Sequence, residues 1–165
     1  MSRSGYSDDC ENIVLYRRAV DNALAGRRGQ AMLRDLLAAL DAMPIKRLAA
    51  DSLTTREGEF CTLGVLGHAR GLDLGKLEGQ EPDVIGHAFG IARSMAAEIV
   101  YMNDEAENDA KPARWIEITG PMREFYPIME HHERYVREPQ DDPEAHRWKR
   151  MRAWVVENLR EVKHG

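Results

Sequence analysis

The most regular feature of the chain is the recurrence of apolar residues at every third or fourth position, the spacing that places side chains on one face of an α-helix. The first such stripe predicts a helix over residues 9–25, which opens with a capping box and ends at Gly26. A wider stripe over 30–43, ended by Pro44, predicts the most deeply buried helix of the fold.

Four further helices follow from the same spacing. Residues 63–71 hold a short apolar stripe that ends in glycine, and residues 82–89 begin with a proline suited to the first turn of a helix. Stripes over 91–103 and 148–162 predict the last two helices, and of the two tryptophans in the final one we expect one to be buried and one partly exposed.

Two glycines interrupt the short helix predicted over 63–71. Gly64 and Gly67 are three residues apart, so they lie on one face of that helix. Glycine inside a helix costs about 1 kcal/mol relative to alanine. We therefore expect a close approach at this face, made by another helix that crosses it.

The helical pattern stops between residues 105 and 140, where four prolines occur and where residues 115–118 suit an extended segment. The whole predicts a mainly α protein, a single compact domain over 1–165 with about six helices and at most a short strand or hairpin near 56–62 or 114–118. We expect segment 105–140 to be an acidic, aromatic insertion that packs on the helical core.

Charge changes the interpretation of this insertion. Residues 103–145 carry twelve acidic and five basic residues, whereas the chain as a whole has a net charge of −5. Aromatic and methionine side chains inside a charged rim are typical of binding surfaces, although they also serve to cover a core. The residues that we predict to contact a partner are Trp115, Phe125, Tyr126, Glu130, Glu133, Tyr135, Asp141 and Asp142.

Composition excludes several classes of protein. No apolar run approaches the roughly 18 to 20 residues that span a bilayer, and no apolar leader follows the polar start, so we expect a cytoplasmic protein with reduced thiols. The acidic block disfavours direct nucleic-acid binding, and the basic final helix is best read as its counter-charge. No phosphate-binding signature is present, and we expect no cofactor.

Cys61 is the one candidate nucleophile, because a thiol at a helix N-terminus can have a lowered pKa. A base would have to lie within about 3 Å of it. His68 is seven residues further on, which on a continuous helix is about 10.5 Å along the axis. We therefore favour a packed core thiol over a catalytic one, and His87 and Asn103 supply no recognised catalytic signature.

The histidines have no ligand spacing typical of a metal site. His131 and His132 are adjacent, so on a helix they would point about 100° apart, and a site would need His131 together with His146 and Asp142 from distant segments. We expect no metal. The run 103–105, Asn-Asp-Glu, could hold a cation but is more typical of a helix end.

Four short motifs carry a resemblance. They are Gly-Glu-x-Cys-x-Leu-Gly-x-Leu-Gly at 58–67, Phe-Gly-Ile-Ala at 89–92, Asn-Asp-Glu at 103–105, and Arg-x-x-x-Trp-Val from Arg150 to Val155. Together they resemble small proteins of bacteriophages and prophages for which we know no activity. The resemblance implies an accessory protein of a mobile element, a class whose small acidic members often bind host machinery.

The sequence thus predicts a binding protein rather than an enzyme. Its partner would be a host protein with a basic surface, which normally binds nucleic acid if the protein is an inhibitor of host defence. The alternatives are a thiol-dependent hydrolase or transferase that uses Cys61, and a virion structural or assembly component. Homo-oligomers remain open.

Overall fold

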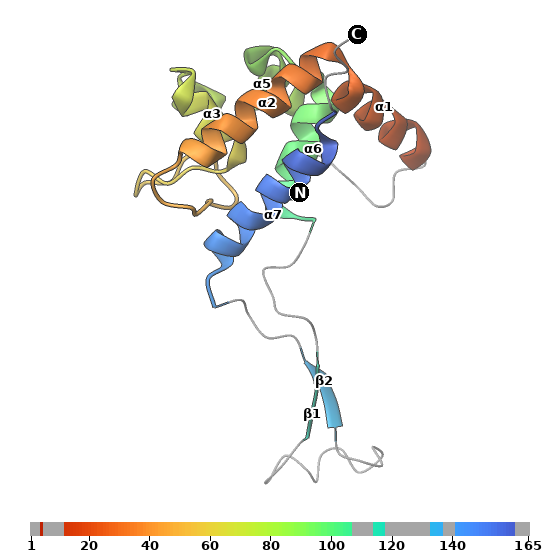
Figure 1. Cartoon of the computed structure of the whole chain (residues 1–165), viewed down its shortest axis with the longest axis vertical. Coiled ribbons are helices and arrows are strands. Elements are labelled where there is room, and N and C mark those ends of the chain that lie inside the picture. Colours follow the sequence, from red (N-terminus) through yellow and green to blue (C-terminus); the bar gives the residue numbers. More distant parts are fainter. Residues whose placement is uncertain (1–3, 5–11, 107–113, 118–132, 137–140, 161–165) are drawn as a thin grey trace. The chain divides into compact units, whose positions relative to one another are not determined.

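A computed structural model describes residues 4, 12–106, 114–117, 133–136 and 141–160. The chain is mainly helical, as its apolar periodicity predicts (Figure 1). The described residues form α1 (Ile13–Ala25), α2 (Arg27–Ala42), α3 (Thr62–Ala69), α4 (Leu74–Leu77), α5 (Pro82–Phe89), α6 (Arg93–Asp104), β1 (Arg114–Glu117), β2 (Glu133–Val136) and α7 (Pro143–Asn158).

Contacts between residues divide the chain into two units. The helical unit comprises Met1–Glu107 and Glu144–Gly165, and the inserted unit comprises Asn108–Pro143. The boundaries of the inserted unit lie within three residues of those predicted for the insertion. Its predicted packing on the helical core stays a prediction.

The two N-terminal helices meet at a tight corner. Gly26 ends α1 and immediately precedes α2, so α2 begins three residues earlier than its apolar stripe predicts. A Cβ added at Gly29 would lie 2.0 Å from the carbonyl oxygen of Ala23. The first turn of α2 therefore packs directly on the backbone of α1, which only a glycine permits.

The core of the helical unit joins α2 and α3 to α6 and α7. In Figure 1, α2 lies between α1 and α3 and contacts both. The apolar stripe of α2 is buried, but the prediction that α2 is the most deeply buried helix is wrong, since six of the eight residues of α3 are buried against six of sixteen in α2. The side chains with no exposed surface include Leu33, Leu36, Leu40, Leu63, Met95, Ile99, Met151 and Val155.

Helix α3 shows the predicted close approach at both glycines, but the predicted partner, another helix, is wrong at Gly64 and is found only at Gly67. A Cβ at Gly64 would lie 1.9 Å from the carbonyl oxygen of Leu53, which belongs to an irregular extended segment and not to a crossing helix. At Gly67 the nearest atoms are side-chain carbons of Leu74 and Phe89. Extended backbone can come closer to a glycine than a helix can, because no side chain stands between the two.

Helices α5 and α6 are joined by Gly90, as the Phe-Gly-Ile sequence predicts. Gly90 has a φ of +71°, the left-handed conformation that ends a helix. The amide of Ile91 then donates to the carbonyl oxygen of Gly86 at 2.9 Å, which closes the last turn of α5. This joint turns the chain so that α6 packs back on α5.

Helix α4 lies between the helices predicted over 63–71 and 82–89, where the apolar spacing predicts no helix. Asp73 caps it, since its carboxylate accepts a hydrogen bond from the amide of Lys76 at 3.3 Å, and the two side chains form an ion pair at 2.9 Å. The side-chain hydrogen bond from Lys76 lowers the pKa of Asp73.

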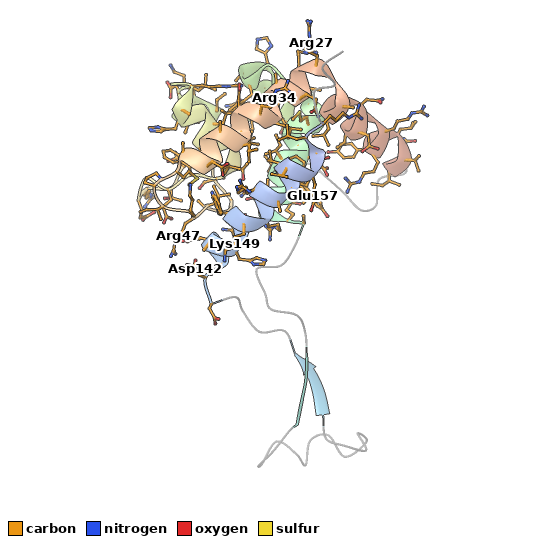
Figure 2. All side chains as sticks on the ribbon, viewed as in Figure 1. Arg27, Arg34, Arg47, Asp142, Lys149 and Glu157 are labelled. Carbon is orange, nitrogen blue, oxygen red and sulfur yellow. The ribbon has the colours of Figure 1, made fainter. Side chains whose placement is uncertain are left out.

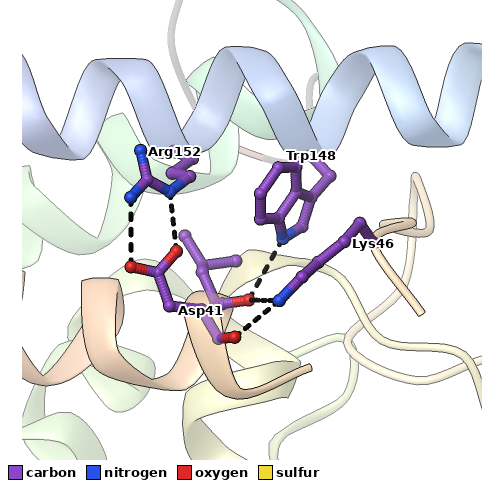
Figure 3. A network of polar contacts seen from close by, with 5 residues as sticks. Asp41, Lys46, Trp148 and Arg152 are labelled. Carbon is purple, nitrogen blue, oxygen red and sulfur yellow. Dashed lines mark hydrogen bonds and ion pairs between the residues drawn. The ribbon is translucent and has the colours of Figure 1, made fainter. Parts of the chain in front are cut away.

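Helix α7 is fastened to the end of α2 by the polar network in Figure 3. Arg152 donates to both carboxylate oxygens of Asp41, at 2.6 and 3.1 Å, and this hydrogen bonding lowers the pKa of Asp41. The carbonyl oxygen of Leu40 accepts hydrogen bonds from Lys46 and from the indole of Trp148. The carbonyl oxygen of Leu40, in the last turn of α2, thereby gains partners from outside the helix.

The described residues of the inserted unit form an antiparallel pair of strands, of which β1 lies at the position predicted for a short strand, near 114–118, and β2 lies where no strand is predicted. An isolated bridge between Thr54 and Phe60 likewise falls at the other predicted site, near 56–62. In the strand pair, Trp115 is opposite Tyr135 and Glu117 is opposite Glu133. Since strand positions two apart share a face, these four positions lie on the same face of the pair.

Candidate functional site

The predicted partner-binding residues belong to the inserted unit, and the strand pairing brings three of them together. Trp115 and Tyr135 are register partners, and Glu133 is two positions from Tyr135 on β2. Cross-strand neighbours are about 4.5–5.5 Å apart, so these positions are close enough to contact one partner together. Phe125, Tyr126 and Glu130 lie outside the described residues.

Asp141 and Asp142 are the last two residues of the predicted surface. They precede α7, where Asp141 is exposed and Asp142 is half-buried, and Figure 2 shows Asp142 at this end of the helix. Negative charge at this position is favourable for the helix itself, because the helix N-terminus is electropositive. Asp141 and Asp142 therefore stabilise the N-terminus of α7, whether or not they also contact a partner.

The carboxylates of the acidic block are divided between the two units. Of its twelve carboxylates, eight lie in the inserted unit beside five basic residues, which gives that unit a net charge of −3. The remaining ones belong to the helical unit, and most of those are used there: Asp104 accepts from the amide of Asp51, Glu105 from that of Ser4, and Glu144 pairs with Arg47. Three of the block's four carboxylates in the helical unit thus have a described hydrogen-bond or ion-pair partner.

Cys61 is buried, with 2% of its surface exposed, and belongs to the hydrophobic core. It is the N-cap residue of α3, as predicted, but its amide donates to the carbonyl oxygen of Leu53 at 3.2 Å and closes the chain over it. His68, at the other end of α3, stacks on Phe60 with a centroid distance of 4.8 Å. This environment supports the interpretation of Cys61 as a core thiol.

We expect the thiol of Cys61 to be protected from alkylation in the folded protein. A Cys10→Ser variant leaves Cys61 as the only thiol, and its reaction with iodoacetamide can be followed by mass spectrometry. Labelling should be about 100-fold slower than for a free model thiol, the factor that an opening free energy of about 3 kcal/mol gives. The same protein in denaturant is the control, and native labelling faster than the model thiol would instead support the thiol-enzyme alternative.

Asn103 is predicted to cap the end of its own helix, but its side chain bonds to other segments of the chain. Its side-chain oxygen accepts hydrogen bonds from the amide of Thr62 at 3.0 Å and from the Thr62 hydroxyl at 2.7 Å, while its nitrogen donates to the carbonyl oxygen of Ala49 at 3.0 Å. Asn103 therefore caps the first turn of α3, 41 residues away in sequence. The site is a structural node, and its polar groups are buried and satisfied.

The basic residues of α7 are mostly structural as well. Arg147 is buried and donates to the carbonyl oxygen of Leu48 at 2.7 Å, and Arg150 donates to that of Asn103 at 2.9 Å. Lys149 and Arg160 are exposed. Arg147 and Arg150 thus hold the helix in place and do not form a basic binding surface. No local sequence signal indicates this structural role of the arginines.

The prediction for the two tryptophans of the final helix is confirmed, since Trp154 is buried and Trp148 is half-buried.

An apolar cleft of about 440 Å³ lies among the described residues of the helical unit. It lies between the C-terminal end of α2, the turn that follows, the loop tip near Gly58 and the outer face of α3. Ala42 and Ala69 line it from the two helices, with Phe60 and Ile45 between them. Sequence reasoning missed this cleft, because small residues at helix ends are ordinary in any helical protein.

Comparison of the chain with protein-family models, with curated proteins and with solved structures finds no match.

Two further observations bear on the class of the protein. No helix among the described residues is long and apolar enough to cross a bilayer. Within the same part of the chain, no three histidine, cysteine or carboxylate side chains are grouped as metal ligands would be. The predicted combination of His131, His146 and Asp142 includes a residue outside it.

Proposed function

We propose that the chain is a non-enzymatic binding protein that uses its inserted unit, residues 108–143, to engage a basic surface on another protein. The observation that supports this proposal most is that the acidic, aromatic segment forms a separate compact unit. Within it, the strand pair places Trp115 opposite Tyr135 and Glu117 opposite Glu133. Aromatic anchors beside carboxylates suit a partner rich in lysine and arginine.

The distribution of the acidic block's carboxylates between the two units supports the same proposal. In the helical unit, three of the block's four carboxylates accept hydrogen bonds or pair with arginine, whereas the inserted unit concentrates the other eight in 36 residues. A moderate net charge with aromatic anchors favours a specific protein surface over a phosphate backbone, which would be repelled. We also propose that the protein is an accessory protein of a phage or mobile element and acts in the bacterial cytoplasm. Inhibition of a host defence protein would be one such function.

The experiment compares two charge-reversed proteins in capture from bacterial lysate. The test variant carries Glu130→Lys, Glu133→Lys, Asp141→Lys and Asp142→Lys. The matched control carries Asp21→Lys, Glu57→Lys, Asp83→Lys and Glu157→Lys, four exposed positions in the helical unit. Both variants change the net charge by the same amount.

We expect the test variant to recover at least about tenfold less of the main partner, because like charges across an interface cost several kcal/mol. The control should capture it as wild type does, and capture by wild type should fall as salt is raised. Mass spectrometry measures the recovery, and circular dichroism checks that both variants fold. Equal capture by the two variants would contradict the proposed surface.

A further inference from the structure

The strand pair of the inserted unit has two faces of opposite charge. Strand positions alternate between faces, and one face is the aromatic and acidic one described above, formed by Trp115, Glu117, Glu133 and Tyr135. The other face holds two arginines and two β-branched residues, at positions Arg114, Ile116, Arg134 and Val136. We call these the acidic face and the basic face. The eight positions together are neutral, so the charges are segregated by face.

The acidic face contains a conflict that positive charge would relieve. Glu117 is the register partner of Glu133, and like charges directly opposite each other destabilise a strand pair. On the basic face, by contrast, each arginine is opposite an aliphatic residue. A two-stranded sheet is also only marginally stable by itself. A cation held over the two glutamates would therefore stabilise the strand pair that binds it.

The other charges of the inserted unit offer no excess of positive charge for this purpose. Apart from the strand positions, the unit has six carboxylates and only three basic residues, which are Lys111, Arg123 and Arg137. The net charge of the whole chain, −5, opposes association of two copies at long range. At physiological salt, however, charges further apart than about 8 Å are largely screened, so contacts within an interface decide the outcome.

The basic face fits the acidic face of a second copy. Its two arginines lie in different cross-strand rows, one with Arg114 and the other with Arg134. When two sheets stack in alignment, either row that lies over Glu117 and Glu133 brings one arginine to the carboxylates. The other row brings the second arginine over the two aromatic positions, where a cation–π contact is favourable. This match holds for both strand directions in the stack.

We propose that the inserted unit binds a second copy of this chain, with the basic face of one strand pair on the acidic face of the next. Because the two faces differ, the contact is head-to-tail and can extend beyond a dimer. The acidic face is also the one proposed above to engage a basic partner, so self-association covers that face until a partner displaces the second copy. This competition rests on the proposed function, whereas the self-association does not.

The test reverses the charge of each face in a separate full-length variant. Glu117→Lys with Glu133→Lys gives a protein with two basic faces, and Arg114→Glu with Arg134→Glu gives one with two acidic faces. The matched controls reverse exposed charges of the helical unit, with Asp21→Lys and Asp83→Lys for the first and Arg18→Glu and Arg28→Glu for the second. Sedimentation velocity from roughly 10 μM to 1 mM protein measures the association, and circular dichroism checks the fold.

We expect wild type and both controls to associate as concentration rises, and each face variant alone to associate at least about tenfold more weakly. An equimolar mixture of the two face variants should associate again, because every basic face then has an acidic face to meet. A mixture that stays monomeric while wild type associates would overturn the proposal. So would a wild-type protein that is monomeric throughout, and a loss of thermal stability on reversing the basic face would then assign that face to packing within the chain.

Capture of the basic partner from lysate tests the competition separately. The protein with Arg114→Glu and Arg134→Glu keeps its acidic face but cannot cover it, so it should capture at least about twofold more partner than wild type. Capture equal to or below that of wild type would contradict the competition. If Glu117→Lys with Glu133→Lys abolishes self-association but leaves capture unchanged, the proposed function is wrong and the self-association stands.

Discussion

Replacing Gly64 by alanine should lower the free energy of unfolding by about 3 kcal/mol, the upper part of the range for overpacking. The added Cβ would lie 1.9 Å from the carbonyl oxygen of Leu53, and its next contact is the carbonyl carbon of the same residue at 3.0 Å. Both belong to backbone, so no side-chain rotation relieves the clash. The segment around Leu53 would have to move, although its carbonyl also accepts the amide of Cys61.

Two other glycines provide a graded control. At Gly67 the nearest atom is Cδ2 of Leu74 at 2.6 Å, the end of a side chain that can shift, so Gly67→Ala should cost less. At Gly75 the nearest atom is 3.5 Å away, and Gly75→Ala should be neutral or slightly stabilising. Urea unfolding followed by circular dichroism measures all three. A Gly64→Ala protein as stable as the Gly75→Ala protein would show that Leu53 does not hold this position.

The helices of this fold could be predicted because each leaves its own apolar stripe in the sequence. The start of α5 at Pro82 and its end at Gly90 are local signals of the same kind. The signal for α4 was also present, since Asp73 lies three residues before Lys76, but four residues are too few to show a periodicity. Local chemistry therefore accounts for most of the secondary structure.

The partners of these elements could not be predicted in the same way. Gly64 indicates that something approaches closely, but a backbone carbonyl such as that of Leu53 carries no mark in the sequence. The apolar cleft is lined by Ala42 of α2 and Ala69 of α3, and no spacing along the chain shows that these two residues line one cleft. In the same way, the sequence does not distinguish Glu144, which pairs with Arg47, from the other carboxylates of the acidic block.

Asn103→Leu should be the second strongly destabilising change, by about 3 to 5 kcal/mol. Leucine has nearly the shape of asparagine, so packing is largely kept while the hydrogen bonds are lost. The Thr62 amide, the Thr62 hydroxyl and the Ala49 carbonyl would each lose a partner. Thr62 is fully buried and Asn103 is 1% exposed, so water cannot replace these bonds, and each unsatisfied buried group costs about 1–3 kcal/mol.

A double-mutant cycle separates this polar effect from a general loss of packing. Thr62→Val removes the hydroxyl that donates to Asn103 and should itself cost about 1 kcal/mol or more. Combined with Asn103→Leu, it should add less than its own cost, because the hydroxyl left without an acceptor is then absent. Asn158→Leu is the control, since the Asn158 side chain is half-buried and, among the described residues, donates to the carbonyl oxygen of Trp154 in its own helix. Strictly additive costs in the cycle, measured by urea unfolding, would mean that Asn103 acts through its volume and not as the cap of α3.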